Sequence, residues 1–295
     1  MPFTTSHPAI ILPLKQLWPR WFSLTGLMAG AMSPDLIYFL MATTRYHWVS
    51  HSWLGLVFFC LPTGIIFAFA FHRWFKYHAI ANLPAPLDRR FSGLAVSEFH
   101  VTGGRGWMVL VSSVLIGALS HLFWDSGTHA AGLTVRMIPF LNTRFTMFGA
   151  VWCTYEAAQH ISSVVGGVAM IAFFLRSRFI QRPVSTFSPR SRGEKIRFWL
   201  GTGIAASVFA VAILVFFNHW RGWHIEAGSN IRPALKTLGL ASWAGFFYAV
   251  SVFALAGRAS SAGPAERRGD SRRCPRSGTA AIQEDSPGCP PSIGA

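Results

Sequence analysis

Acidic residues and cysteines are both scarce in this chain. Asp and Glu number 11 among 295 residues, and charged residues of both signs make up 13%, against about 25% in soluble domains. The four cysteines show none of the paired spacing of a zinc ribbon or a redox site. The low charge argues against an ordinary water-exposed surface, and the cysteines define no disulfide framework.

The scarcity of acids leaves a net charge of +15. A strongly basic chain can bind nucleic acid. Here the Arg and Lys residues are better explained as part of the cytoplasmic loops of a membrane protein, because they cluster between apolar segments. We therefore expect membrane lipids as partners and no nucleic acid, while the sequence leaves the oligomeric state open.

Long apolar segments without charge are abundant, and a membrane-spanning helix needs about 20 such residues. Four segments have 18 to 21 residues, and a fifth of 15 residues is predicted to extend backward to Tyr155. The sequence therefore predicts an all-α, polytopic membrane protein with about five transmembrane helices. The five segments are Trp53–Phe71, Trp107–Trp124, Ile161–Leu175, Phe198–Phe217 and Thr237–Gly257.

The N-terminal region contains two shorter apolar pieces, Ala9–Trp18 and Trp21–Ser33, separated by Pro19 and Arg20. At helical rise each piece covers about 15–20 Å, which is too short for a hydrocarbon core of about 30 Å. We predict a re-entrant helical hairpin with both ends on one face of the membrane, covered by the neighbouring spans. The alternative is a single span over residues 22–41, kinked at Pro34.

The distribution of basic residues orients this arrangement. The loops 72–106 and 176–197, together with the chain after Gly257, carry eighteen of the 26 Lys and Arg residues. The side of the membrane with more Lys and Arg is the cytoplasmic one. The N-terminus and the loop 125–154 are then predicted to face outward.

The composition changes after Gly257, where Arg, Ser, Gly, Pro and Glu replace almost all large apolar residues. Such a segment cannot bury enough apolar surface to order itself. We expect residues 1–257 to form a helical membrane domain and residues 258–295 to form a disordered, basic C-terminal tail.

Ionisable side chains next to the predicted spans are functional candidates, because charge is costly in lipid. In the predicted topology, seven of them lie at the outer membrane level. Imidazole and carboxylate groups are ligands that zinc and similar divalent ions prefer. The sequence thus predicts a metal site, with zinc as the first choice, and its candidate ligands are His7, Asp35, His51, His121, Asp125, His129 and His160.

Spacing supports part of this set. His121 and Asp125 are four residues apart, which places both on one face of a helix, and Glu156 and His160 repeat the offset. Ordinary explanations exist for each residue: a histidine beside a span can be an interfacial residue, and Asp35 can cap a helix. His121 and Asp125 can also be a hydrogen-bonded pair without a metal.

Five short motifs resemble an uncharacterised family of bacterial membrane proteins, known only by a domain-of-unknown-function label. That family is similar in turn to the YdjM-like membrane-bound proteins, which are described as metal-dependent hydrolases. The resemblance covers residues 1–255. The motifs are Met1 to Pro8, Ser33-Pro34-Asp35, Ser50-His51-Ser52, Gly117 to Asp125, and Gln159 to Ser163.

The resemblance implies that His7, Asp35, His51, His121 and Asp125 are site residues. The last pair is also reminiscent of the zinc phospholipase C and P1 nuclease superfamily. The sequence departs from the hydrolase pattern in two places. Ile37 stands where a second carboxylate is usual, which weakens an expectation of two metal ions, and Ser50 replaces a threonine.

The resulting functional hypothesis is a membrane-embedded metal-dependent hydrolase in the bacterial inner membrane. His121 and Asp125 are its predicted catalytic pair, and a metal-bound water would supply the nucleophile. A site at the bilayer surface favours an amphiphilic phosphate ester as substrate. The alternative is a non-enzymatic membrane protein, in which the same residues form a structural metal site or an ion or proton relay in a transporter-like or scaffold protein.

Overall fold

The computed structural model describes residues 4–41, 46–147, 150–177, 180–181, 183–185 and 187–221. Contacts divide the chain into two units, Met1–Ala256 and Gly257–Ala295, and all described residues belong to the first. The predicted span Thr237–Gly257 and the predicted tail therefore lie outside the described residues.

Three helical segments among the described residues are long and apolar enough to cross a membrane. They contain the predicted spans Trp53–Phe71, Trp107–Trp124 and Ile161–Leu175, and the last begins at Thr154, next to the predicted start at Tyr155. The segments are Trp53–Ala81, Gly103–Met137 and Thr154–Arg176.

The predicted span Phe198–Phe217 lies within a 30-residue helix, α13 (Arg192–Arg221), that is not one of these three segments. The number of suitable helices in the described part of the chain is thus three, against five predicted for the whole. The basic and acidic side chains of Arg192, Glu194 and Lys195 occupy the first turn of α13.

The first candidate span is a continuous helical run with two π-helical turns, and the other two are regular α-helices. The run consists of α5 (Trp53–Gly55), η3 (Leu56–Cys60), α6 (Leu61–Ala70), η4 (Phe71–Phe75) and α7 (Lys76–Ala81). The regular helices are α10 (Gly103–Thr128), which is followed by the short α11 (Leu133–Met137), and α12 (Thr154–Arg176). The remaining short helices are α4 (His47–Ser50), α8 (Leu87–Arg90), α9 (Ser92–Val96) and η5 (Pro139–Asn142).

The N-terminal region forms two helical arms, and the start of the first arm contacts the second arm at Asp35. The hydroxyl of Thr4 donates a hydrogen bond of 2.7 Å to Oδ2 of Asp35, which joins the start of the first arm to the second. The second arm continues past Pro34 for seven residues, and a 3-10 turn, η2, interrupts its α-helix at Ser33–Asp35. The arms consist of η1 (Thr4–Ile11) and α1 (Leu12–Leu17), and of α2 (Leu24–Met32), η2 (Ser33–Asp35) and α3 (Leu36–Met41).

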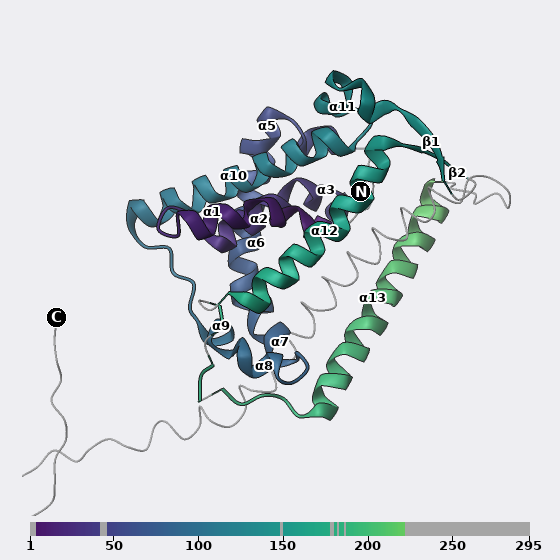
Figure 1. Cartoon of the computed structure of the whole chain (residues 1–295). Coiled ribbons are helices and arrows are strands. Elements are labelled where there is room, and N and C mark those ends of the chain that lie inside the picture. The colour runs from purple at the N-terminus through teal and green to yellow at the C-terminus, as the bar shows by residue number, and fades with distance from the viewer. Residues whose placement is uncertain are drawn as a thin grey trace, which may run out of the picture. The chain divides into compact units, whose positions relative to one another are not determined.

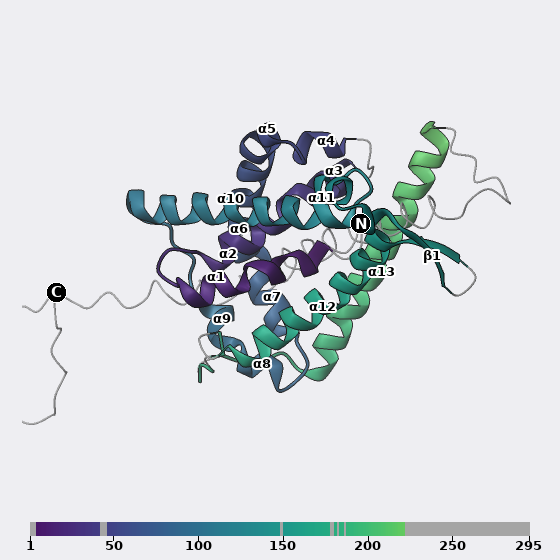
Figure 2. The same cartoon turned by 45° about the horizontal axis from the view of Figure 1, so that its top comes forward.

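Helix α2 packs between other helices, with α10 and α6 against it (Figures 1 and 2). The crossing with α10 is close because both helices carry glycine there. A Cβ atom on Gly30 would lie 2.1 Å from the carbonyl oxygen of Val114, and one on Gly117 would lie 2.2 Å from that of Leu27. Such contacts between backbones require small residues, as in many membrane helix pairs.

Apolar side chains cover much of the outside of the three candidate spans. Phe58, Phe123 and Val164 are each exposed by about 70% or more of their surface. A contiguous apolar exterior of this kind is rare in soluble monomers and suits contact with lipid. These helices therefore indicate a membrane protein. Other exposed apolar residues of the spans are Ile66, Met108, Ile161, Val165, Val168 and Ile171.

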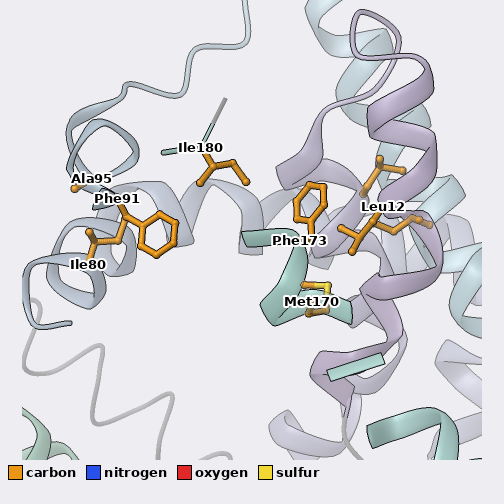
Figure 3. Close-up of a cluster of buried hydrophobic side chains, with 9 residues drawn as sticks. Leu12, Ile80, Phe91, Ala95, Met170, Phe173 and Ile180 are labelled. Atoms are coloured by element: carbon orange, nitrogen blue, oxygen red, sulfur yellow. The ribbon is translucent and has the colours of Figure 1, made fainter. Parts of the chain in front are cut away.

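A buried apolar cluster joins the first arm to α12 and to the loop after α7 (Figure 3). Met170 and Phe173 of α12 lie near Leu12, while Ile80 and Phe91 lie toward the loop side. This cluster fixes the first arm against α12, which brings the start of the arm to the N-terminal half of that helix.

One expectation about the fold class was wrong in detail. The described chain is mostly helical, but strands β1 (Arg144–Met147) and β2 (Ala150–Cys153) form a two-stranded antiparallel sheet between α10 and α12. In Figures 1 and 2 this hairpin projects beyond the helices. Half of the strand residues are β-branched or aromatic, a composition that favours strands.

An ion pair joins the loop between the first two candidate spans to α13. Lys195 of α13 donates to Oδ2 of Asp88, whose side chain is 2% exposed. Burial by itself raises the pKa of Asp88. The hydrogen bonds from Lys195 and from the backbone N–H of Arg89, together with their charges, outweigh burial and lower that pKa below its usual value.

An Asp88→Asn substitution is expected to destabilise the protein above about pH 4, near the pKa of an unfolded aspartate. It leaves the partly buried Lys195 without its carboxylate, a change that costs about 3–5 kcal/mol in fully buried pairs and less in this partly exposed one. Since the folded pKa is depressed, the stabilisation is present above the unfolded pKa and is lost as the pH falls through the folded pKa. Thermal unfolding in detergent at a series of pH values measures the difference between variant and wild type.

The control is the double variant Asp88→Asn, Lys195→Met, which removes both charges. It is expected to recover much of the lost stability, because no buried charge remains unpaired. A single variant that unfolds at the wild-type temperature at pH 7 would contradict the stabilising role of this pair.

Candidate metal centre

Four of the seven predicted ligands meet at one point between three segments of the chain. Each offers one ligand atom, and the four atoms all lie within 4.8 Å of one another. Asp35 comes from η2 in the second arm, His51 from the turn before α5, and the other two from the end of α10. The four residues are Asp35, His51, His121 and Asp125.

His121 is fully buried, and a backbone carbonyl orients its ring. Nδ1 lies 2.8 Å from the carbonyl oxygen of Ala31. Because a carbonyl oxygen only accepts, Nδ1 must carry the hydrogen. Nε2 then faces Oδ1 of Asp35 at 3.4 Å and Oδ2 of Asp125 at 3.2 Å.

His51 has the same arrangement. Its Nδ1 lies 3.1 Å from the carbonyl oxygen of His47 and 2.9 Å from the hydroxyl of Ser50. Nε2 is directed to the carboxylates, 3.5 Å from Oδ2 of Asp125 and 3.9 Å from Oδ1 of Asp35. Histidine ligands of metal ions commonly donate their second N–H to a carbonyl in this way.

The two carboxylates are held by their other oxygen atoms. Thr4 donates to Oδ2 of Asp35, and Nε2 of His7 lies 3.1 Å from Oδ1 of Asp125. The His7 ring also stacks on that of His121, with 4.1 Å between centroids. One oxygen of each carboxylate, Oδ1 of Asp35 and Oδ2 of Asp125, thereby faces the two Nε2 atoms.

The atoms that face one another in the centre all accept hydrogen bonds when the two imidazoles are neutral. Oδ1 of Asp35 and Nε2 of His121 are both buried without a hydrogen-bond partner. Two carboxylates and two imidazole lone pairs at this distance repel one another unless a positive charge lies between them. Ligands about 2.0–2.2 Å from a tetrahedral zinc ion are about 3.3–3.6 Å apart. The four His–Asp distances here are 3.2–3.9 Å, and all ligand atoms lie within 4.8 Å of one another. The residues present therefore fit a divalent ion.

Three predicted ligands lie outside this group of four. His7 contacts the far oxygen of Asp125, and Nδ1 of His129 lies 3.4 Å from the same oxygen. His160 is exposed, with its ring edge-on to Trp152 at 5.7 Å between centroids. His7 and His129 are thus neighbours of the site, whereas His160 is directed away from it.

Gln159 takes the place that the sequence interpretation gave to His160. Its side-chain Nε2 lies 3.0 Å from Nε2 of His129. Adjacent residues of a helix point about 100° apart, so only one of Gln159 and His160 can face the site. Thr4 and the carbonyl groups of Ala31 and His47 were also not predicted. Carbonyl contacts carry no signal in side-chain identity, although Thr4 and Gln159 both belong to quoted motifs.

A polar pocket adjoins the centre on the side of His7 and Asp125. Its cavity volume is about 10 Å³, room for about one water molecule. Trp124 of α10 and Ser162 of α12 connect two sides of the pocket, because the indole N–H of Trp124 donates a hydrogen bond of 3.2 Å to the hydroxyl of Ser162. The pocket therefore brings hydroxyl, amide and carboxylate groups together beside the candidate metal ligands. Its lining consists of Ser6, His7, Trp124, Asp125, Thr128, Gln159, Ser162 and Ser163.

Comparison with known families places the chain. A family model described as "Domain of unknown function (DUF4184)" matches residues 1–255. The chain belongs to the DUF4184 family. All residues of the centre and of the pocket lie within the part of this DUF4184 chain that the family model matches. No curated protein and no solved structure matches the chain.

The family assignment confirms the resemblance to an uncharacterised family over residues 1–255. None of the three comparisons supports the further similarity to YdjM-like hydrolases or to zinc phospholipase C. The inference of a metal centre in this DUF4184 chain therefore rests on the geometry of the four residues alone.

Proposed function

We propose that this DUF4184 protein is a membrane-embedded metal-dependent hydrolase with one divalent ion, zinc as the first choice. The ion is held by Asp35, His51, His121 and Asp125. The supporting observation is the pair of facing, unpartnered atoms, Oδ1 of Asp35 and Nε2 of His121, in a fully buried position. An ion bound there supplies the positive charge that these groups need, and it lowers the pKa of a coordinated water.

Hydrolysis is supported by the pocket and by the resemblance to the YdjM-like membrane-bound proteins. The pocket reaches Asp125 and His7 from the side of α12 and has room for about one water molecule, so an attacking water can sit beside the ion there. Exposed apolar helices flank the site, and such surroundings suit an amphiphilic phosphate ester. We place the protein in the bacterial inner membrane, with the C-terminus cytoplasmic and the site on the outer face, from its basic loops.

A non-enzymatic role has its own supporting observation. Four protein ligands close a tetrahedral shell, as in structural zinc sites, whereas catalytic sites keep an open position. A second form of this alternative has no metal: a protonated His121 can donate to both Asp35 and Asp125 and serve as a proton relay. Catalysis at a closed shell requires expansion to five ligands, which zinc permits.

Hydrolysis is tested with the full-length protein in detergent micelles after loading with Zn²⁺ or Mn²⁺. The probe is a p-nitrophenyl ester of a long-chain alkyl phosphate. Wild type is expected to release p-nitrophenol, and His121→Ala is expected to lose this turnover together with its metal. His160→Ala is the matched control, because His160 is exposed and points away from the centre.

A second variant separates catalysis from structure. Ser163→Leu places a large side chain in the pocket without altering any of the four proposed ligands. Under the hydrolase proposal it keeps the metal and loses most turnover. A wild-type protein that binds the metal stoichiometrically and shows no turnover with the probe would instead support the structural role.

A further inference from the structure

The connection between α10 and α12 is a surface of unusual composition. Residues 130–153 contain no acidic side chain and two arginines, Arg136 and Arg144. The described part of this connection, residues 130–147 and 150–153, exposes a series of large apolar side chains. They are Leu133, Met137, Ile138, Phe140, Phe145, Met147 and Val151, each exposed by 37% or more.

The strand register sorts the hairpin into two faces. Directly opposed residues of an antiparallel pair point to the same face, and neighbours along a strand point to opposite faces. Phe145 pairs with Trp152 and Met147 pairs with Ala150, which gives one wholly apolar face. The other face carries the pairs Arg144 with Cys153 and Thr146 with Val151.

The apolar face adjoins a lipid-facing flank of α12. Trp152 packs edge-on against His160 near the start of that helix. Ile161, which follows His160, and Val164 and Val165, about one turn further, are each at least 60% exposed. The apolar face of the hairpin is thus continuous with the apolar exterior of a candidate span.

The short helix α11 is divided in the same way. Val135 is buried, whereas Leu133, Arg136 and Met137 are exposed. Short segments with large apolar groups, basic side chains and no acids bind the interface of anionic membranes. The connection begins within the candidate segment Gly103–Met137 and ends at α12, so a membrane that contains α10 and α12 would hold both ends of the connection near its surface.

We propose that residues 130–147 and 150–153 form an interfacial strap that lies within the headgroup layer of an anionic lipid leaflet. Phe145 and Met147 face the acyl chains, and Arg136 and Arg144 bind the lipid phosphates. The strap joins the two helices that line the polar pocket, so it holds the pocket at the level of the lipid headgroups. The proposal depends on the membrane assignment and not on metal binding or hydrolysis.

Depth measurement tests the strap. Single-cysteine variants of the full chain, Phe145→Cys, Met147→Cys and Thr146→Cys, are labelled with the fluorophore NBD in a background without native cysteines. The protein is reconstituted in vesicles of phosphatidylcholine and phosphatidylglycerol. Labels at 145 and 147 are expected to be quenched by nitroxide lipids severalfold more than the label at 146, which aqueous iodide should quench instead.

Equal access of iodide to all three labels would overturn the proposal, because the hairpin would then lie in water. Strong nitroxide quenching at all three would also overturn it, since a fully immersed hairpin has no interfacial side. Thermal unfolding of each labelled variant verifies that the fold is retained. A loss of metal binding or of hydrolysis leaves these depths unchanged, so the two proposals fail separately.

Lipid charge is tested with Arg136→Gln and Arg144→Gln, and Arg105→Gln is the matched control at the other end of α10. Bound phosphatidylglycerol and phosphatidylcholine are compared after purification from mixed vesicles. Each strap variant is expected to lower the preference for phosphatidylglycerol by about five-fold, the factor for one basic residue at an anionic surface. An unchanged preference in the Arg136→Gln, Arg144→Gln double variant would overturn the anionic part of the proposal.

Discussion

An Asp125→Ala variant of the full-length protein, purified in detergent, is expected to contain almost no divalent metal, while wild type contains one ion per chain. Asp125 contributes Oδ2 to the centre and lies within 3.5 Å of the Nε2 atoms of both His51 and His121. Loss of a residue that only hydrogen-bonds to a metal ligand lowers metal affinity by about 10- to 100-fold. Loss of a ligand should exceed this range, and elemental analysis with chelator competition measures it.

A graded series of variants makes this prediction sharper. His121→Ala and Asp35→Ala are expected to behave like Asp125→Ala, because each removes one of the four facing atoms. Thr4→Val and His7→Ala remove only the groups that orient the carboxylates, and a loss of about 10- to 100-fold is expected for each. His160→Ala should bind metal as wild type does.

The absence of metal from wild type and from every variant would contradict the metal centre. The buried carboxylates would then be neutralised by a proton on His121. That outcome has its own signature, because His121→Ala would leave Asp35 and Asp125 facing each other without a positive charge. The variant would be strongly destabilised at neutral pH and less so in acid, where the carboxylates take up protons.

The convergence of the site was predictable from sequence because it follows from topology. Apolar length located three candidate spans, and the short N-terminal pieces predicted a chain that returns to its starting level. Those two inferences placed His7, Asp35 and His51 beside the end of α10, where the structure has them. Four-residue spacing paired His121 with Asp125 correctly.

The limits of the sequence interpretation have physical causes. The same spacing rule paired Glu156 with His160, but Glu156 accepts a hydrogen bond from the backbone N–H of Cys153 at the start of α12. A capping role and a ligand role look alike in sequence, because both place an acid in the first turn. Whether Gln159 or His160 faces the site depends on the rotation of α12 about its axis. The apolar pattern of a helix that is exposed on most sides does not predict that rotation.

The division of roles between inner and outer histidines was also beyond the sequence. His7, His51 and His129 are all imidazoles beside spans, yet only His51 directs Nε2 to both carboxylates. Its orientation depends on the carbonyl group of His47, a backbone atom that every residue has. Side-chain identity therefore predicts which groups can bind an ion, and backbone geometry decides which of them do.

A Gly117→Ala variant is expected to weaken both the fold and the metal centre. The added Cβ would lie 2.2 Å from the carbonyl oxygen of Leu27 and 2.7 Å from the backbone nitrogen of Ala31. Backbone atoms cannot turn aside as a side chain can, so α2 and α10 must separate. Overpacking of this kind costs about 1–3 kcal/mol, and thermal unfolding in detergent should show a lower midpoint.

The expected loss of metal affinity follows from the position of the contact. Gly117 lies four residues before His121, and the carbonyl group of Ala31 that orients the His121 ring is on α2. Separation of the helices lengthens that hydrogen bond, so metal affinity should fall by about 10- to 100-fold, as expected for Thr4→Val and His7→Ala. Gly167→Ala is the matched control, because a Cβ at Gly167 meets nothing within 4 Å. If Gly117→Ala unfolds at a lower temperature yet binds metal as wild type does, the centre does not depend on the α2–α10 crossing, and the Ala31 carbonyl is not what orients His121.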